Sequence, residues 1–242
     1  MDVIITKDYE EMSRKAAEIL LDVVKNNETP VLGLATGSSP IGTYDAMAED
    51  HEKNGTDYSK VVPYNLDEYV GLPITHKESY YAFMHHHLFD RVGIKEENTH
   101  LPNGLAEELD KACTEYEEML KKVSIDVQLL GIGSNGHIGF NEPGTPADSE
   151  THVVNLTENT IRDNSRFFIP LGEETPTQAV SMGLASIMRS KKIVLVASGA
   201  NKADAVYRMV NGEITVDCPA TILRNHPDVT VIVDAEAGMK LK

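Results

Sequence analysis

The sequence contains few cysteines and no long apolar run, and both absences exclude classes of protein. Its two cysteines, Cys113 and Cys218, stand far apart without a Cys-x-x-Cys spacing, so neither a disulfide framework nor a zinc site is expected. No apolar run reaches the roughly 18–20 residues that a membrane-spanning helix needs. The first residues lack the basic start and apolar middle of a signal peptide. We therefore expect a soluble, cytoplasmic protein with no membrane partner.

Basic residues are scarce relative to acidic ones. The chain has 22 Lys and Arg against 38 Asp and Glu, a formal net charge of −16. A surface of this sign repels nucleic acid and anionic membranes, so neither is expected as a partner. A phosphate ligand would also be repelled at long range. Its binding would have to come from local donors such as helix N-termini, lysine or arginine.

Short runs rich in Val, Ile and Leu alternate with longer segments of helical periodicity. Continuous apolar strands are typical of a parallel sheet that is covered on both faces. No repeat, low-complexity tract or linker interrupts the alternation, which predicts one doubly wound α/β domain over residues 1–242. The expected strands are Val3–Thr6, Val31–Ala35, Val61–Leu66, Ile125–Gly131, Ile193–Ala197 and Val229–Val233.

Four segments carry helical signals. Asp8 and Glu11 form a capping-box pattern ahead of an apolar stripe that continues through Val24. The run Thr175-Pro176-Thr177-Gln178 has a cap residue, an early proline and a glutamine three residues after the cap, which predicts a helix start. The other two expected helices are Leu105–Leu120 and Ala200–Val210, the latter ending at Asn211-Gly212.

Ligands of doubly wound folds bind beyond the carboxyl ends of the strands, so binding and catalytic residues are expected in the strand-to-helix turns. The first turn, Thr36-Gly37-Ser38-Ser39-Pro40, can cradle a phosphate with its hydroxyls and helix N–H groups. It fits an ordinary turn equally well. The second turn, Asn65-Leu66-Asp67-Glu68-Tyr69, places two acids at a strand end, where one can act as a general base. Residue types alone favour a helix cap or a solvated pair there.

The third turn is a glycine-rich loop, Gly131–Gly144. Its glycines through Gly136 match the GxGxxG pattern of dinucleotide-binding loops, but that motif needs a helix directly afterwards. Two glycines and two prolines follow within ten residues and break any helix, so we reject a dinucleotide cofactor. What remains is a loop that presents His137, which can titrate near neutral pH, and Glu142, which can orient it. A functional interpretation is favoured for this loop.

The fourth turn, Ser198-Gly199-Ala200-Asn201-Lys202, places a lysine in the first turn of a helix. A cation there opposes the helix macrodipole, and a bound anion would resolve the conflict, although the lysine can also extend into solvent. His85-His86-His87 resembles a metal tract, but adjacent helical residues point about 100° apart and do not converge on one ion, so no metal is expected. Arg162 and Arg166 lie in a polar stretch, and Arg166 is a second candidate phosphate anchor.

These turns, in this order, resemble the glucosamine-6-phosphate deaminase family over nearly the whole chain. The resemblance implies a Rossmann-like, three-layer α/β sandwich and an enzyme without metal or redox cofactor that converts glucosamine 6-phosphate and water to fructose 6-phosphate and ammonia. The most specific matching pieces are Asn65-Leu66-Asp67-Glu68-Tyr69-Val70-Gly71-Leu72, Ser79-Tyr80-Tyr81, Gly136-His137-Ile138-Gly139-Phe140-Asn141-Glu142-Pro143, Asn164-Ser165-Arg166-Phe167-Phe168 and Gly199-Ala200-Asn201-Lys202.

The resemblance also implies roles for single residues. Asp67 would be the base that moves the C2 proton, and His137, held by Glu142, would help to open the pyranose ring. Asn135 stands where the family often has Asp, so Glu142 is left as the carboxylate beside the histidine. The segment Asn155–Arg166 would belong to a lid. The residues implied to bind the substrate are Thr36, Gly37, Ser38, Ser39, Gly136, Arg166 and Lys202.

Regulation and assembly are less determined. Some members of the family are activated by N-acetylglucosamine 6-phosphate through basic residues after the Asn-Glu-Pro motif. The corresponding stretch here, Gly144–Val154, has no Lys or Arg, and the chain is short at its C-terminus, so no such activation is expected. Family members range from monomers to hexamers, and the sequence does not fix the oligomeric state.

Two alternative functions are considered. The first is 6-phosphogluconolactonase, a related enzyme on the same fold, which also uses a histidine in a glycine loop. Tyr69 and the run Phe140-Asn141-Glu142-Pro143 match the deaminases instead. The second is a non-catalytic sugar-phosphate sensor. Such proteins usually carry a DNA-binding module, for which this chain has neither spare length nor a basic patch.

Overall fold

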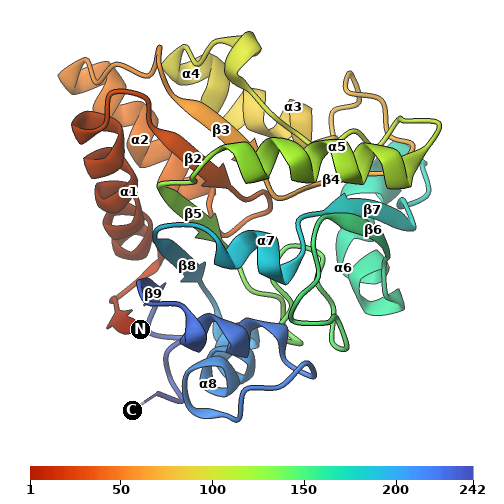
Figure 1. The fold of residues 1–242 in the computed structure, drawn as a ribbon. Helices are drawn as coiled ribbons and strands as arrows, with labels where there is room; N and C mark the ends of the chain where they lie inside the picture. Colours follow the sequence, from red (N-terminus) through yellow and green to blue (C-terminus); the bar gives the residue numbers. More distant parts are fainter. Residues whose placement is uncertain (242) are drawn as a thin grey trace.

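A six-stranded parallel sheet forms the centre of the protein, described by a computed structural model that covers residues 1–241 (Figure 1). Its strands lie in the order β1-β9-β8-β5-β2-β3, and every neighbouring pair is parallel. The bounds agree within two residues with the strands expected from the apolar runs, which confirms the doubly wound fold. They are β1 Asp2–Ile5, β2 Val31–Leu34, β3 Val62–Asn65, β5 Val127–Leu130, β8 Ile193–Ala197 and β9 Val229–Val233.

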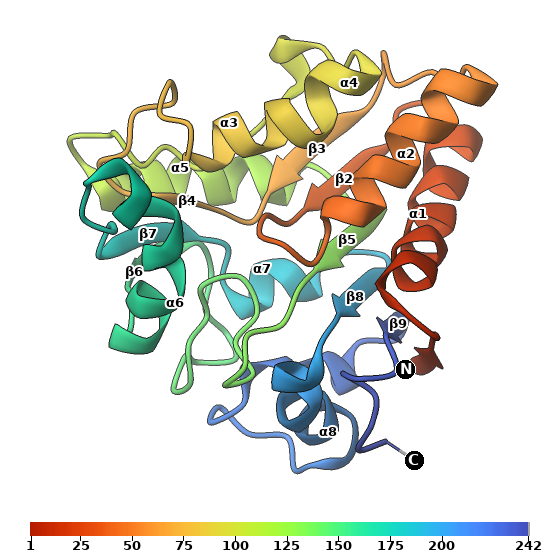
Figure 2. The same cartoon turned by 180° about the vertical axis from the view of Figure 1, so that it is seen from behind.

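Helices cover both faces of this sheet and make it the middle layer of a sandwich (Figures 1 and 2). Strand β8 shows why, because Val194 and Val196 pack with one helix layer while Ile193 and Leu195 pack with the other. The first layer holds α1 Tyr9–Asn26, α2 Ile41–Asn54 and α4 Asp90–Val92. The second holds α5 Leu109–Lys122, α7 Leu184–Met188 and α8 Ala203–Asn211. No helix within residues 1–241 is long and apolar enough to cross a membrane.

The expected helix starts differ in how well they match the structure. Asp8 caps α1, where the backbone N–H of Glu11 donates to its side chain at 2.9 Å. The Glu11 carboxylate bonds back to the N–H of Lys7, one residue earlier than in the standard capping box. Helix α5 begins at Leu109 rather than at Leu105, which lies half exposed in the preceding loop. A 3₁₀ turn, Ala200–Lys202, precedes α8.

A second, antiparallel sheet projects from one end of the first, and the sequence did not predict it (Figure 1). Its order is β4-β7-β6, and its strands are β4 Asp67–Tyr69, β7 Gln178–Ser181 and β6 His152–Asn155. The helix expected from Thr175 is therefore wrong. The local start signals are overridden because β7 is the central strand and pairs on both sides, with Ala179 and Val180 fully buried.

One residue joins the two sheets. Leu66 lies between β3 and β4, and its N–H donates to the carbonyl of Leu34 in the main sheet at 3.1 Å. Its carbonyl accepts from the N–H of Met182, directly after β7, at 2.7 Å. The two sheets are thus linked both covalently and by hydrogen bonds at this point, and Asp67 follows immediately.

Helices α3 and α6 lie beside the small sheet. After Ser79 the chain forms α3 Tyr80–Met84, which continues as a π-helical turn, His85–Phe89, so the three histidines lie on a wider turn than an α-helix. Helix α6 Glu158–Phe168 follows β6, packs on the small sheet and is continued by a 3₁₀ turn. Arg162 and Arg166 therefore lie on a helix and not on a loop. The two other 3₁₀ helices are Glu96–Asn98 and Pro219–Asn225.

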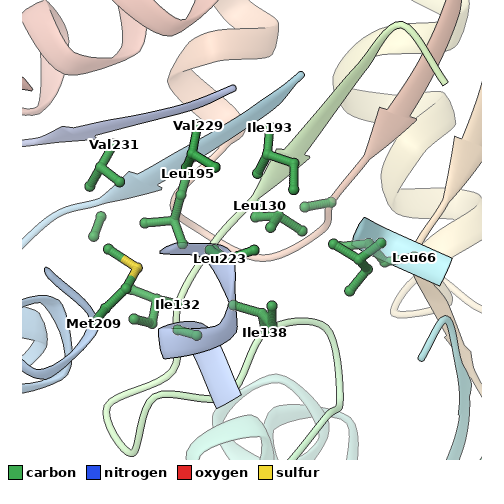
Figure 3. Packing of buried hydrophobic residues seen from close by; sticks show 14 of the residues in the cluster. Leu66, Leu130, Ile132, Ile138, Ile193, Leu195, Met209, Leu223, Val229 and Val231 are labelled. Carbon is green, nitrogen blue, oxygen red and sulfur yellow. The ribbon is translucent and has the colours of Figure 1, made fainter. Parts of the chain in front are cut away.

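The glycine-rich loop is anchored in the core at two points, Ile132 and Ile138, which lie on either side of His137 in the sequence. Ile132 and Ile138 are 5% and 0% exposed, and Figure 3 shows them directed toward Leu223 and Met209. The next helix begins only at Glu158, which confirms that the glycines and prolines after Gly136 prevent a helix. The buried isoleucines fix the loop that carries His137.

Candidate active site

The candidate site lies where the main sheet changes direction. Strands β2 and β5 are neighbours, and the chain proceeds outward from β2 to β3 but from β5 to β8 and β9. The loops after β2 and β5 therefore diverge, which opens a hollow at the carboxyl ends of the strands. A cleft of about 950 Å³ lies there, and the small sheet and α6 contribute to its wall.

The cleft brings together residues from all four predicted turns. The candidates that line it are Thr36, Gly37, Ser38, Ser39, Asp67, His137, Arg166 and Lys202. Asn135 and Glu142 lie behind His137 and contact it or its loop. Gly136 does not line the cleft. Its φ of +92° and its backbone contact with Cys218 leave no room for a side chain, since a Cβ would lie 2.4 Å from the sulfur.

The turn after β2 is built to expose backbone N–H groups. Gly37 adopts a φ of +91°, and no side chain caps the start of α2, whose first turn has no acidic residue. The Tyr9 hydroxyl donates to the Ser38 carbonyl at 3.0 Å and accepts from the N–H of Gly42 at 2.8 Å, so it fixes the turn. A fixed, uncapped helix N-terminus with adjacent hydroxyls is a favourable site for an anion.

Two cations face this turn across the cleft. Burial lowers the pKa of Lys202, and the charge of Arg166 lowers it further, against the opposing effect of Asp163. The guanidinium of Arg166 lies 4.7 Å from the centre of the Phe167 ring. The alternative interpretation had Lys202 extending into solvent. The structure instead places it partly buried at the cleft. A bound anion would relieve the repulsion between the two cations.

Asp67 faces the cleft from the first residue of β4. Its side chain is 6% exposed, and it pairs in register with Ser181 of β7. Burial, followed by the charge of the neighbouring Glu68, raises the pKa of Asp67 to about 8. A carboxyl group with this pKa can both take up and release a proton near neutral pH.

Glu68 points away from the cleft and has a structural role. Its carboxylate accepts from the backbone N–H groups of Tyr69 at 2.8 Å and of Tyr80 and Tyr81 at 3.0 Å each. The side chain thus caps α3 from a distance of twelve residues in sequence. Burial raises the pKa of Glu68 in spite of these three donors. Of the two adjacent acids, Glu68 is therefore a helix cap and Asp67 is a residue of the cleft.

His137 lies against a carboxylate that is held in its ionised form. Its Nδ1 is 3.4 Å from Oε2 of Glu142, and that oxygen also accepts from the Asn135 amide at 2.7 Å. Burial alone would raise the pKa of Glu142, but the contacts with His137, Thr160 and Asn135 outweigh it and lower the value to about 2. The histidine ring packs on Gly133, where a Cβ would lie 2.2 Å from a ring atom.

The candidate site therefore combines two carboxyl groups with widely separated pKa values. Asp67, at about 8, lines the cleft from β4, and Glu142, at about 2, lies behind His137 in the glycine-rich loop. Carboxyl groups whose environments push their pKa values apart are typical of acid–base catalysis. An anion site adjoins them. This arrangement suits proton transfer on a small phosphorylated molecule.

The model of the family described as glucosamine-6-phosphate isomerases/6-phosphogluconolactonase matches residues 7–232. The chain belongs to this family. A protein named glucosamine-6-phosphate deaminase from Thermoanaerobacter pseudethanolicus is 53% identical over 239 residues, which cover 98% of this chain and 94% of that protein. One of the same name from Clostridioides difficile is 51% identical and covers 100% and 97%.

A solved structure supports the same assignment to the family. It is described as a monomeric glucosamine-6-phosphate deaminase and matches with a TM-score of 0.96 at 42% identity, covering 99% of both chains. The fold predicted from the sequence, a Rossmann-like sandwich with a mostly parallel sheet, is confirmed by this match. The family resemblance of the turns is confirmed as well.

Sequence reasoning did not assign roles to several residues of the cleft. Thr160, Asn164 and Tyr80 line it together with the candidates, and Thr157 reaches Glu142 from the N-cap of α6. The sequence did contain a pattern for Thr157 and Thr160. Threonine is a preferred N-cap residue, and these two threonines stand three positions apart at the start of a helix. The contact of this helix with Glu142 depends on tertiary structure and has no local signal.

Proposed function

We propose that this protein converts glucosamine 6-phosphate and water to fructose 6-phosphate and ammonia, as a deaminase of amino-sugar catabolism. One observation carries the proposal. At a single cleft an anion-binding turn and the buried Asp67 meet His137, which is backed by Glu142, a carboxylate of much lower pKa. The relatives that are 51–53% identical over the whole chain carry the name of this activity.

The substrate is bound through its phosphate. The turn Thr36–Ser39 supplies N–H and hydroxyl donors, and Lys202 and Arg166 supply charge. These local donors overcome the repulsion of a chain with a net charge of −16. With the phosphate held at the ends of β2 and β8, the sugar lies along the cleft between Asp67 and His137.

The first chemical step opens the sugar ring. His137, held beside Glu142, exchanges protons between the O1 hydroxyl and the ring oxygen O5. The C1–O5 bond breaks and leaves the C1 aldehyde. Asn135 holds Glu142 and the N–H of His137, so the pair keeps its orientation during the transfer.

The second stage is an isomerisation followed by loss of nitrogen. Asp67 removes the proton from C2 and delivers it to C1, through an enediol-type intermediate. O1 gains the proton that the amino nitrogen loses, which leaves an alcohol at C1 and an imine at C2. Water adds to the imine, and the resulting carbinolamine releases ammonia to give the C2 ketone. No hydride moves in this sequence. Each general acid–base contribution is of the order of 10²–10⁴-fold.

The alternatives are less well supported. A lactonase carries out no proton transfer between C2 and C1, and the relatives that are 51–53% identical carry the name of the deaminase. A sensor without catalysis would need neither the Asp67 nor the Glu142 environment. We further propose that the protein acts in the cytoplasm on this sugar phosphate, with no nucleic acid or membrane as partner.

The decisive experiment measures ammonia and fructose 6-phosphate released from glucosamine 6-phosphate in the presence of a chelator. Equal amounts of both products are expected, and Asp67→Asn should nearly abolish them. Asp148→Asn, an exposed carboxylate, serves as the matched control and should behave as the wild type. Absence of ammonia from the wild type would overturn the proposal. Acid released from 6-phosphogluconolactone instead would favour the lactonase, and tight binding without turnover the sensor.

A further inference from the structure

Helix α6 reaches the carboxylate that faces His137. Thr157 is the N-cap of this helix, and its hydroxyl lies 3.3 Å from Oε1 of Glu142. The hydroxyl of Thr160, one turn later, donates to the same oxygen. Thr160 is only 6% exposed, and its hydroxyl also lies 3.1 Å from that of Thr157. Two side chains of one helix thus converge on one carboxylate oxygen.

The two oxygens of Glu142 therefore have separate sets of partners. Oε2 faces the glycine loop, where Asn135 donates at 2.7 Å and His137 lies 3.4 Å away. Oε1 faces the two hydroxyls of α6. Among the described residues, His137 is the one titratable group in contact with this carboxylate, and the other partners are uncharged. The orientation of Glu142 is therefore fixed from both sides.

The bond from Thr160 is not the one that a helical threonine normally makes. Threonine inside a helix usually donates back to a carbonyl of the preceding turn. The Thr160 hydroxyl instead leaves its helix for Glu142, across a gap of eighteen residues in sequence. The same helix presents Asn164 and Arg166 to the cleft. The element that carries a phosphate anchor thus also holds a carboxylate.

We propose that Thr160 is a positioning residue: its hydroxyl holds Oε1 of Glu142 and thereby keeps Oε2 directed at His137. This inference rests on the proposed function, since it assigns Thr160 a part in ring opening. Thr157 assists from the helix cap. A hydrogen bond to a charged partner contributes about 1.5–3 kcal/mol, which corresponds to about ten- to a hundredfold in a rate or an equilibrium constant.

The test replaces Thr160 by valine, which has the same shape but no hydroxyl. We expect kcat for ammonia release to fall at least tenfold while KM changes less than twofold, because the phosphate anchors are untouched. Thr160→Ser should restore most of kcat. Thr114→Val serves as the matched control, because the Thr114 hydroxyl bonds within its own helix on the surface.

A second measurement does not depend on activity. Carbon-13 NMR of the glutamate carboxyl groups, with Glu142→Gln to assign the signal, follows the protonation of Glu142 between pH 8 and 4.5. The wild-type signal should stay constant, and Thr160→Val should raise the pKa of Glu142 by about two units, so that protonation begins at the acid end of this range. Because this readout needs no turnover, it tests Thr160 even if the wild type releases no ammonia, which would overturn the proposed function alone.

The outcomes separate positioning from a merely structural role. A loss of thermal stability in Thr160→Val with wild-type kcat and a constant Glu142 signal would overturn the inference. If the valine protein does not fold, Thr160→Ala is used in its place. Wild-type kcat and a constant Glu142 signal in that variant would also overturn the inference. Reduced kcat, serine rescue and a shifted Glu142 titration together would establish it.

Discussion

The side-chain amide of Asn164 donates a 2.9 Å hydrogen bond to the hydroxyl of Tyr69. Tyr69 is buried in β4, two residues after Asp67 and therefore on the same side of the strand. Its ring meets Phe168, at the end of α6, edge to face at 5.7 Å. Helix α6 and strand β4, which carries the candidate base, thus form one packed unit. A displacement of the helix would therefore shift the position of Asp67.

Tyr69→Phe should uncouple this unit. The change leaves the half-buried Asn164 amide without its acceptor, which costs about 1 kcal/mol of folding stability. We expect a several-fold decrease in kcat/KM for glucosamine 6-phosphate, because α6 no longer holds its place over the cleft. Steady-state kinetics and thermal unfolding check both effects. Tyr207→Phe, on an exposed tyrosine, is the control, and equal behaviour of the two variants would contradict the coupling.

Asp67→Asn should remove activity and raise stability at the same time. The folded pKa of Asp67, about 8, lies above its ordinary value of 3.8, so burying the charged form costs stability as pH rises from about 4 to 8. Below pH 4 the group is protonated in both states and the cost vanishes. The melting temperature of the variant should therefore exceed that of the wild type increasingly from pH 4 to pH 8. A constant difference over this range would count against the buried charge.

The pH dependence of kcat/KM should report the same group. A base must be deprotonated to act, so kcat/KM should rise about tenfold per pH unit below pH 8 and level off above it. Glu142, with a pKa of about 2, should add no inflection between pH 4 and 8. Rates measured from pH 5.5 to 9.5 at constant ionic strength check this. A flat profile between pH 6 and 9 would show that another group limits the reaction.

Lys202→Met should weaken binding of the phosphate. The variant keeps the length of the side chain but removes a partly buried charge, so KM for glucosamine 6-phosphate and the inhibition constant of inorganic phosphate should both rise tenfold or more. Lys111→Met removes an exposed lysine and should leave both unchanged. An unaltered inhibition constant in Lys202→Met would remove this residue from the phosphate site.

N-acetylglucosamine 6-phosphate should not activate the protein. The stretch Gly144–Val154 has no Lys or Arg, and it forms a loop followed by the edge strand β6. The velocity should depend hyperbolically on substrate with and without this compound. A sigmoidal curve that the compound converts to a hyperbola would contradict the expectation.

The main sheet could be predicted because its signal is local. Strands such as Ile193–Ala197 are buried on both faces and read as continuous apolar runs, and their ends set the positions of the candidate turns. The small sheet carries no such signal. Strand β4 begins with two acids, and β7 follows a helix-like Thr-Pro start, so both depend on pairing with distant segments.

The candidate site shows the same limit. Its residues could be named from their turns, and the cleft brings eight of them together. The residue types of Asp67 and Glu68 could not show that Glu68 is a cap, because the helix start that it caps lies twelve residues away at α3. Nor could the sequence show that Gly136 packs against Cys218. Local patterns place a residue on an element, whereas its partners are set by tertiary packing.

The joint at Leu66 has a consequence for protein engineering. One residue separates a sheet whose strand ends carry the proposed phosphate turn from a sheet that carries Asp67 and leads into α6. Leu66 is bonded to both sheets through its own N–H and carbonyl, so it defines a natural boundary for exchanging segments. Exchange of the short strand β4 with that of a distant homologue would change the residue at the position of Asp67, while the turn Thr36–Ser39 would stay as it is in this chain.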